Sequence, residues 1–254
     1  MHFLFPSGPL NPRQVDEAFL PQMEAFRALG HSTSLFSMET EQLRGPIPEG
    51  SPVVYRGWML NASEYQKLID LIRARGAEPL IPLETYLSCH HLPNWYPLIS
   101  DLTPETRIFP AGADLASELA ALGWDRFFLK DYVKSLKTSV GSVISRPQEA
   151  DSFIAEMKKF RGEIEGGLCV RRFEPFQPGA EVRYFVIEGT PHAPSGAVPG
   201  LVTECARRIA SPFFSVDVTL REDGVLRVVE IGDGQVSDLV GWEAEQFAGL
   251  WPAV

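Results

Sequence analysis

Two acidic residues on a predicted hairpin are the first candidates for chemistry. Asp217 and Glu230 lie in valine-rich runs that flank Asp223-Gly224, a dipeptide that favours a tight two-residue turn. With that turn, Asp217 faces Glu230 directly, and like charges so placed repel each other. Mg²⁺ between the two carboxylates would remove the repulsion, because this ion is bound through one or two carboxylates plus substrate phosphates. The pair therefore predicts a metal site beside a nucleotide. A three-residue loop would instead place the carboxylates on opposite faces, as ordinary solvated acids.

Lysines upstream of the hairpin provide positive charge for a polyphosphate. Lys130 ends a strand predicted over Arg126–Lys130, and Lys134 and Lys137 follow in a polar loop with Gly141. Backbone amides of such a loop, together with lysine ammonium groups, bind phosphate. The loop is not a Walker motif, because no glycine precedes the lysine at the required spacing. A solvent-exposed loop is the alternative interpretation.

Arginines on predicted strands are further candidates. Arg171 and Arg172 are neighbours on a strand over Leu168–Arg172, so their side chains point to opposite faces and only one can line a given cleft. Arg183 lies on a strand over Glu181–Ile187. An arginine in a central strand needs a carboxylate or phosphate partner, so each of these residues indicates either a ligand or a structural ion pair.

A substrate contact is predicted in the first half of the chain. Arg56 follows a strand over Val53–Tyr55, at the carboxyl end where α/β sheets place ligand contacts. Four aromatic residues are candidates to line a pocket or to fill a core, namely Trp58, Trp95, Tyr96 and Trp242.

The elements that must position these residues fall into two parts. Up to about residue 100, strands and helices alternate, which predicts a small open α/β domain over residues 1–105. Its expected strands are Phe3–Phe5, Ser34–Ser37 and Val53–Tyr55, and its helices are Pro12–Leu29 and Glu64–Arg75, the second capped by Asn61 or Ser63. Leu83–Ile108 is interpreted as a connector with short helices.

The second part, over residues 106–254, is dominated by strands with inserted helices, an α+β arrangement. Its expected helices are Ala113–Leu122, Pro147–Phe160 and one that carries Glu204, Arg207 and Arg208, and its strands are Arg126–Lys130, Val143–Ser145, Leu168–Arg172, Glu181–Ile187 and the hairpin.

Composition narrows the class of protein. The 254 residues carry a net charge of −10, which disfavours non-specific binding to nucleic acid. No apolar run approaches the ~20 residues that span a bilayer, and the N-terminus lacks the features of a signal peptide. Three scattered cysteines, Cys89, Cys169 and Cys205, are expected to be reduced thiols of a cytoplasmic protein. The sequence does not determine the oligomeric state.

From Phe127 to Asp238, the order of these residues resembles the ATP-grasp superfamily. The segment FFLKDYVKSLKTSVGSVI is similar to that family's strand-terminal lysine and flexible phosphate loop, and Glu174-Pro-Phe-Gln-Pro-Gly179-Ala-Glu181 is similar to its segment between subdomains. The resemblance implies an ATP-grasp fold of two subdomains that enclose the nucleotide, preceded by an α/β pre-ATP-grasp-like unit.

The resemblance also implies roles for individual residues. Lys130 and Lys137 would hold the α- and β-phosphates, Glu174 the adenine side with Phe176, and Glu181 the ribose. Asp217 and Glu230 would bind Mg²⁺. A divergent clade with added arginines matches best, and Arg172 and Arg183 would then act in catalysis, with Arg56 at the substrate. The family's third metal ligand is replaced here by Gly232, for which Asp233 or Asp238 would substitute.

The implied activity is ATP- and Mg²⁺-dependent ligation of a carboxylate to an amine, on an amino acid or peptide-like substrate, through an acyl phosphate. Three alternatives remain open at this stage. A small-molecule kinase would use the same phosphate-binding residues, and a nucleotide-binding module without catalysis would be consistent with Gly232. A ligase acting on RNA or protein is the third, and the acidic composition disfavours its RNA form.

Overall fold

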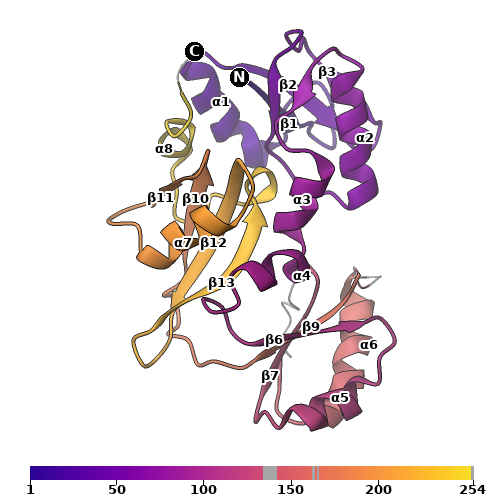
Figure 1. Ribbon diagram of the computed structural model, residues 1–254. Coiled ribbons are helices and arrows are strands. Elements are labelled where there is room, and N and C mark those ends of the chain that lie inside the picture. The colour runs from indigo at the N-terminus through magenta and orange to yellow at the C-terminus, as the bar shows by residue number, and fades with distance from the viewer. Residues whose placement is uncertain (134–141, 162–163, 165, 253–254) are drawn as a thin grey trace. The chain divides into compact units, whose positions relative to one another are not determined.

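The computed structural model describes residues 1–133, 142–161, 164 and 166–252 (Figure 1). It divides into two compact units, the first comprising residues 1–89, 182–217 and 232–254, and the second residues 90–181 and 218–231. Neither unit is one continuous segment, so this division differs from a linear boundary at residue 105. The predicted phosphate-loop residues Lys134 and Lys137 lie outside the described residues.

The first unit contains a five-stranded sheet in the order β3-β2-β1-β4-β5. Four strands run parallel, namely β1 (His2–Pro6), β2 (Ser32–Ser37), β4 (Pro52–Tyr55) and β5 (Glu78–Pro79), while β3 (Gln42–Arg44) is antiparallel at the edge. Every residue of central β1 is buried, as expected for a parallel strand covered on both faces. The three predicted strands are confirmed. The polar edge strand β3 has no apolar pattern by which it could be predicted.

Helices of the first unit begin at recognisable signals. Asn61 caps α2 (Ala62–Arg73), its Oδ1 accepting from the amides of Ser63 and Glu64 at 3.0 Å each, while Glu64 accepts from the Asn61 amide at 2.8 Å. The helix predicted from Pro12 begins later, as η1 (Glu17–Phe19) and α1 (Leu20–Ala28). The other helices of this unit are α3 (Leu83–His90), whose last residue belongs to the second unit, α7 (Gly200–Arg208) and α8 (Ala244–Ala248). Within the described part of the chain, no helix is both long enough and apolar enough to cross a membrane.

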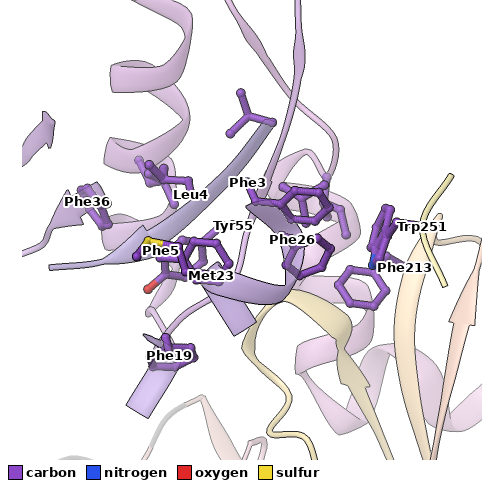
Figure 2. Packing of buried hydrophobic residues seen from close by; sticks show 14 of the residues in the cluster. Phe3, Leu4, Phe5, Phe19, Met23, Phe26, Phe36, Tyr55, Phe213 and Trp251 are labelled. Carbon is purple, nitrogen blue, oxygen red and sulfur yellow. The ribbon is translucent and has the colours of Figure 1, made fainter. Parts of the chain in front are cut away.

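The core of the first unit joins residues far apart in sequence (Figure 2). Phe3 of β1 stacks on Phe26 of α1 with ring centroids 3.7 Å apart. The Trp251 ring meets Phe3 edge to face at 5.3 Å and Phe213 at 5.0 Å. Since full burial of one such side chain contributes roughly 1.5–3 kcal/mol, the last turn of the chain contributes to the stability of the N-terminal sheet.

The second unit contains an antiparallel sheet in the order β6-β9-β7-β8. Its strands are β6 (Thr106–Pro110), β9 (Gly167–Arg172), β7 (Phe127–Asp131) and β8 (Val143–Ile144). Helices α5 (Leu115–Leu122) and α6 (Ala150–Arg161) pack on one face, and the core there includes Leu119, Phe127, Leu129, Phe153 and Val170. Helix α4 (Leu92–Trp95) and the 3₁₀ turns η2 (Tyr96–Leu98) and η3 (Pro147–Glu149) complete this unit. Strand β6 falls in the predicted connector.

A second four-stranded sheet has the order β11-β10-β12-β13. It comprises β10 (Val182–Ile187), β11 (Thr190–His192), β12 (Phe213–Leu220) and β13 (Leu226–Asp233), and the last two form the predicted hairpin. The two-residue turn is wrong. The Arg221 amide donates to the Val225 carbonyl at 2.8 Å, which leaves the three-residue loop Glu222–Gly224, with Gly224 at φ 88°. The count that placed Asp217 directly opposite Glu230 therefore does not apply.

Candidate functional site

Lys130 and Glu230 form an ion pair in the second unit. Lys130 Nζ donates to Glu230 Oε1 at 2.8 Å, and the lysine side chain is 5% exposed while that of the glutamate is 40% exposed. Strand alternation explains the position of the lysine. Phe127 and Leu129 point into the helix-covered core, so Lys130 points to the other face of β7. The pair thus presents a buried cation beside a partly accessible carboxylate.

Arg171, rather than Arg172, shares the sheet face of Lys130. In the β7–β9 register Lys130 pairs with Cys169 and Phe128 with Arg171, so these side chains lie on one face. Arg171 is buried, its Nη1 donates to the Val229 carbonyl, and its guanidinium lies 5.5 Å from the Trp95 ring. Among the described residues, its Nε and Nη2 have no hydrogen-bond partner.

Burial lowers the pKa of Arg171 to about 10, and the charge of Glu230 opposes that change. The guanidinium therefore remains charged at neutral pH. It has two buried N–H groups for which an anionic ligand would provide acceptors.

Arg172 lies on the helix-covered face of the same strand. Its side chain is 60% exposed and its Nη1 is 4.0 Å from Glu105 Oε2. The structure therefore does not bring Arg172 together with Lys130. The sequence indicates that Arg171 and Arg172 point to opposite faces, but only the strand register shows which face each residue occupies.

Arg183 and Asp217 form the strongest ion pair of the first unit. Arg183 Nε and Nη2 donate to the two carboxylate oxygens of Asp217 at 2.7 and 2.6 Å, and the Asp217 side chain is 3% exposed. The arginine also donates from Nη1 to the Asp238 carbonyl at 3.1 Å. Asp217 is the carboxylate partner that an arginine on a strand requires, and the pair has the geometry of a bidentate ion pair.

Glu174 is held by two arginines that were not candidates from sequence. Arg227 Nε and Nη2 donate to its two oxygens at 3.0 Å each, and Arg221 lies 3.3 Å away. Phe176 forms a β-bridge with Arg221, and Glu181 is exposed immediately before β10. The Glu174 carboxylate therefore fixes the linker segment to the hairpin, and its contact with adenine stays a prediction.

Asp233 lies in the interior of the first unit. Its Oδ1 accepts from the Gln235 amide at 3.0 Å and from Gln235 Nε2 at 3.1 Å, and the side chain is fully buried. Burial raises the pKa of this carboxyl to about 7. The prediction that Asp233 is the third metal ligand is corrected on this ground, because its oxygens are directed into the core. The described residues contain no cluster of three or more His, Cys, Asp or Glu residues suited to a metal.

Arg56 is a second correction. The guanidinium is buried and donates to Gln22 Oε1 at 3.1 and 2.9 Å, to the Ser237 carbonyl at 3.0 Å, and to the Gly234 carbonyl. It also lies 4.7 Å from the Phe247 ring, and burial lowers its pKa to about 9. Arg56 therefore anchors the segment after β13 to the parallel sheet and presents no exposed donor to a substrate.

Comparison with solved structures identifies the class of fold. A D-cycloserine synthetase matches with a TM-score of 0.66 and 13% identity over 98% of both chains. A RimK-domain ATP-grasp protein from Sphaerobacter thermophilus matches with a TM-score of 0.63 and 19% identity, again over 98% of both. A macrocyclase from Microcystis aeruginosa, bound to a precursor peptide, matches with a TM-score of 0.63 and 13% identity over 98% and 99%. The chain has the ATP-grasp fold over nearly its whole length, as predicted.

The particular family follows from the sequence of the second half. Residues 121–254, just over half of the chain, match the model of an ATP-grasp domain, family 3 of the clade that is named for two arginines and a lysine. The protein belongs to this family of ATP-grasp enzymes, which confirms the predicted superfamily and the clade with added arginines. No curated protein matches the sequence.

Proposed function

We propose that this protein is an ATP- and Mg²⁺-dependent ligase that joins a carboxylate to an amine through an acyl phosphate. The family and the fold support ATP as the cosubstrate, and the similar solved structures include a synthetase and a peptide macrocyclase. The observation that carries the proposal is the group of Lys130, Glu230 and Arg171. It places two buried cations and a partly exposed carboxylate on one sheet face.

The phosphates of ATP fit this group by charge and hydrogen bonding. Lys130 would bind the α- and β-phosphates, as the resemblance implies, together with Lys137 from outside the described residues. The two unpartnered N–H groups of Arg171 would donate to phosphate oxygens. We therefore propose Arg171 as a phosphate-binding arginine. Arg172 keeps its proposed catalytic role only if its exposed side chain reaches the substrate.

Asp217 and Glu230 fit Mg²⁺ as donors, because both are carboxylates and this hard cation prefers oxygen ligands. When bound, the ion would neutralise charge on the β- and γ-phosphates. Arg183, which holds both oxygens of Asp217, would then position that carboxylate or stabilise the transferred phosphoryl group. Glu174, Phe176 and Glu181 remain our proposed contacts to adenine and ribose.

The proposed reaction has two steps. An oxygen of the substrate carboxylate attacks the γ-phosphorus and the bond to the β-phosphate oxygen breaks, which releases ADP and leaves an acyl phosphate. The amine nitrogen then attacks the acyl carbon, phosphate leaves, and the nitrogen loses its proton. Lys130 and Arg171 would stabilise negative charge on the phosphates during the first step.

Trapping with hydroxylamine tests this reaction. The full chain is incubated with ATP, Mg²⁺ and pools of amino acids and short peptides, with and without hydroxylamine. We expect ADP release that depends on a carboxylate, a hydroxamate in the presence of hydroxylamine, and an amide in its absence. A stable phosphate ester would identify a kinase. Absence of ADP release with every pool would favour a nucleotide-binding module.

Variants test the residues. Asp217→Asn and Glu230→Gln are expected to lower ADP release by at least about 100-fold, because each removes a metal-binding carboxylate. Glu222→Gln, an exposed acid in the loop of the same hairpin, is the matched control and should retain activity. Unchanged turnover in both site variants would contradict the proposal.

A further inference from the structure

A tryptophan in the loop after β4 is exposed but held in place. The Trp58 side chain is 51% exposed. Its Nε1 nevertheless donates to Asp16 Oδ2 at 2.9 Å, and its ring meets the Phe19 ring edge to face with centroids 5.0 Å apart. The Tyr55 hydroxyl donates to the Trp58 carbonyl at 3.0 Å. A rigid, exposed aromatic side chain provides contact area for a ligand at low entropic cost.

The residue before Trp58 is constrained as well. A Cβ atom on Gly57 would lie 2.3 Å from the Tyr55 ring, so a side chain cannot be accommodated without rearrangement. The Gly57 amide donates to the Gln235 carbonyl at 3.1 Å. The loop is therefore fixed on both sides of the residue that presents the indole.

Trp58 lines two cavities of the first unit, and their side chains favour positive charge. The first cavity has a volume of about 410 Å³, the second about 420 Å³. The first combines aromatic rings with carboxylates, from Phe19, Trp58, Trp242, Asp238, Glu243 and Glu245. Among the described residues, the lining of neither cavity includes Lys, Arg or His. Aromatic faces and carboxylates together are the groups that attract organic cations.

The second cavity lies at the carboxyl ends of β1, β2 and β4, where parallel sheets bind ligands. Its acidic residues are Asp16, Glu39 and Glu64. Ser7 also lines it, and the buried Ser7 Oγ has no hydrogen-bond partner within the described ranges. A polar atom left in that state indicates that a ligand group or water would complete the site.

The first cavity adjoins the residue that holds Asp217. Arg183 Nη1 donates to the Asp238 carbonyl at 3.1 Å, and Trp242 Nε1 donates to the Arg183 carbonyl at 2.9 Å. Two residues of the lining thus contact Arg183 directly. A ligand in this cavity lies beside residues that we assign to the reaction.

We propose that the cavities on either side of Trp58 bind an organic cation, a primary ammonium or guanidinium group on an aliphatic chain such as that of lysine or arginine. The indole provides the aromatic face, and the carboxylates provide the opposite charge. In the proposed ligation this cation belongs to the amine substrate, and that assignment rests on the proposed function. The binding site itself rests on the cavities and their lining.

Calorimetry on the full chain without ATP tests binding directly. The probes are N-acetyl-lysinamide, N-acetyl-argininamide and the uncharged N-acetyl-norleucinamide, which matches lysine in chain length. We expect saturable binding of at least one cation and affinity for the uncharged probe lower by about tenfold or more. Equal affinity for the uncharged probe, or no binding of either cation, would overturn the proposal.

Three variants and a control locate the site. Trp58→Leu is expected to weaken cation binding about tenfold, while Trp58→Phe, which keeps an aromatic face, retains most of it. The double variant Glu243→Gln with Glu245→Gln should weaken binding about fivefold or more at low salt. Glu49→Gln with Glu84→Gln removes the same charge from exposed positions elsewhere in the first unit and should have no effect. Equal losses in the control pair would refute a local site.

The outcome separates this inference from the proposed function. Cation binding with no ligation of any cationic amine would leave the site established and refute only its assignment to the substrate. Ligation that is insensitive to Trp58→Leu and to the acidic double variant would support the reaction and overturn the cation site.

Discussion

The guanidinium of Arg183 donates to both carboxylate oxygens of Asp217, at 2.7 and 2.6 Å, and the aspartate side chain is 3% exposed. Two neighbouring strands, β10 and β12, provide the partners. A buried pair of this kind contributes less to net stability than its geometry suggests, but loss of one member is costly because the other charge remains buried.

Arg183→Gln is therefore expected to destabilise the fold by about 3 kcal/mol. The double variant with Asp217→Asn should be less destabilised than the sum of the two single variants, because no charge is left without its partner. Urea unfolding measures all three. Arg207→Gln, at an exposed helical ion pair, is the control and should cost less than about 1 kcal/mol. Additive effects of the two core substitutions would contradict the coupling.

The pair of Lys130 and Glu230 predicts an asymmetry. Lys130→Met replaces a buried cation by an apolar side chain of similar length and should change stability by less than about 1.5 kcal/mol. Glu230→Gln removes the carboxylate that faces the buried ammonium and should cost more. Both variants are expected to bind ATP weakly by calorimetry. Retained ATP affinity in Lys130→Met would contradict the role proposed for this lysine.

Arg56 is expected to matter for folding rather than for substrate affinity. Arg56→Met leaves the carbonyls of Gly234 and Ser237 without their buried donor, so the free energy of unfolding should fall by about 3 kcal/mol. Thermal unfolding and the KM of any substrate are measured together. A raised KM at unchanged thermal stability would restore the substrate role predicted from sequence.

Asp233 predicts a dependence of stability on pH. Burial raises its pKa to about 7 from an ordinary value of 3.8. Between these two values the folded state binds more protons than the unfolded state, so this residue lowers stability as pH rises, by up to about 1.4 kcal/mol per pH unit, and the loss persists above pH 7. Asp233→Asn should abolish this contribution in urea unfolding from pH 5 to 8, whereas the exposed control Asp151→Asn should not. An unchanged slope in Asp233→Asn would refute the shift.

Local signals predict much of the fold. Asn61 caps α2 and Gly123 ends α5 in a left-handed conformation, as the residue types indicate. Collinear motifs are sufficient to predict the ATP-grasp fold, which the structural matches confirm. Helix α1 begins later than its sequence pattern predicts, because residues 7–16 are held against the strand ends by long-range bonds such as Asp16 amide to Pro6 carbonyl at 2.9 Å.

The site is less predictable because it depends on register and burial. Asp223-Gly224 fits a two-residue or a three-residue loop, and only the bond between Arg221 and Val225 distinguishes them. Strand alternation indicates that Arg171 and Arg172 diverge, but pairing with β7 decides which one shares a face with Lys130. The burial of Arg56 and Asp233 depends on the chain after β13, which no local pattern connects to β4.

The discontinuous first unit has a consequence for the order of synthesis. Phe3 and Phe26 are among the earliest residues made, yet their aromatic cluster includes Phe213, Phe247 and Trp251. A nascent chain cannot complete this core until residue 251 has been made. The N-terminal sheet must therefore wait with part of its apolar surface uncovered during most of translation, so we expect chaperone binding to nascent chains to be concentrated there.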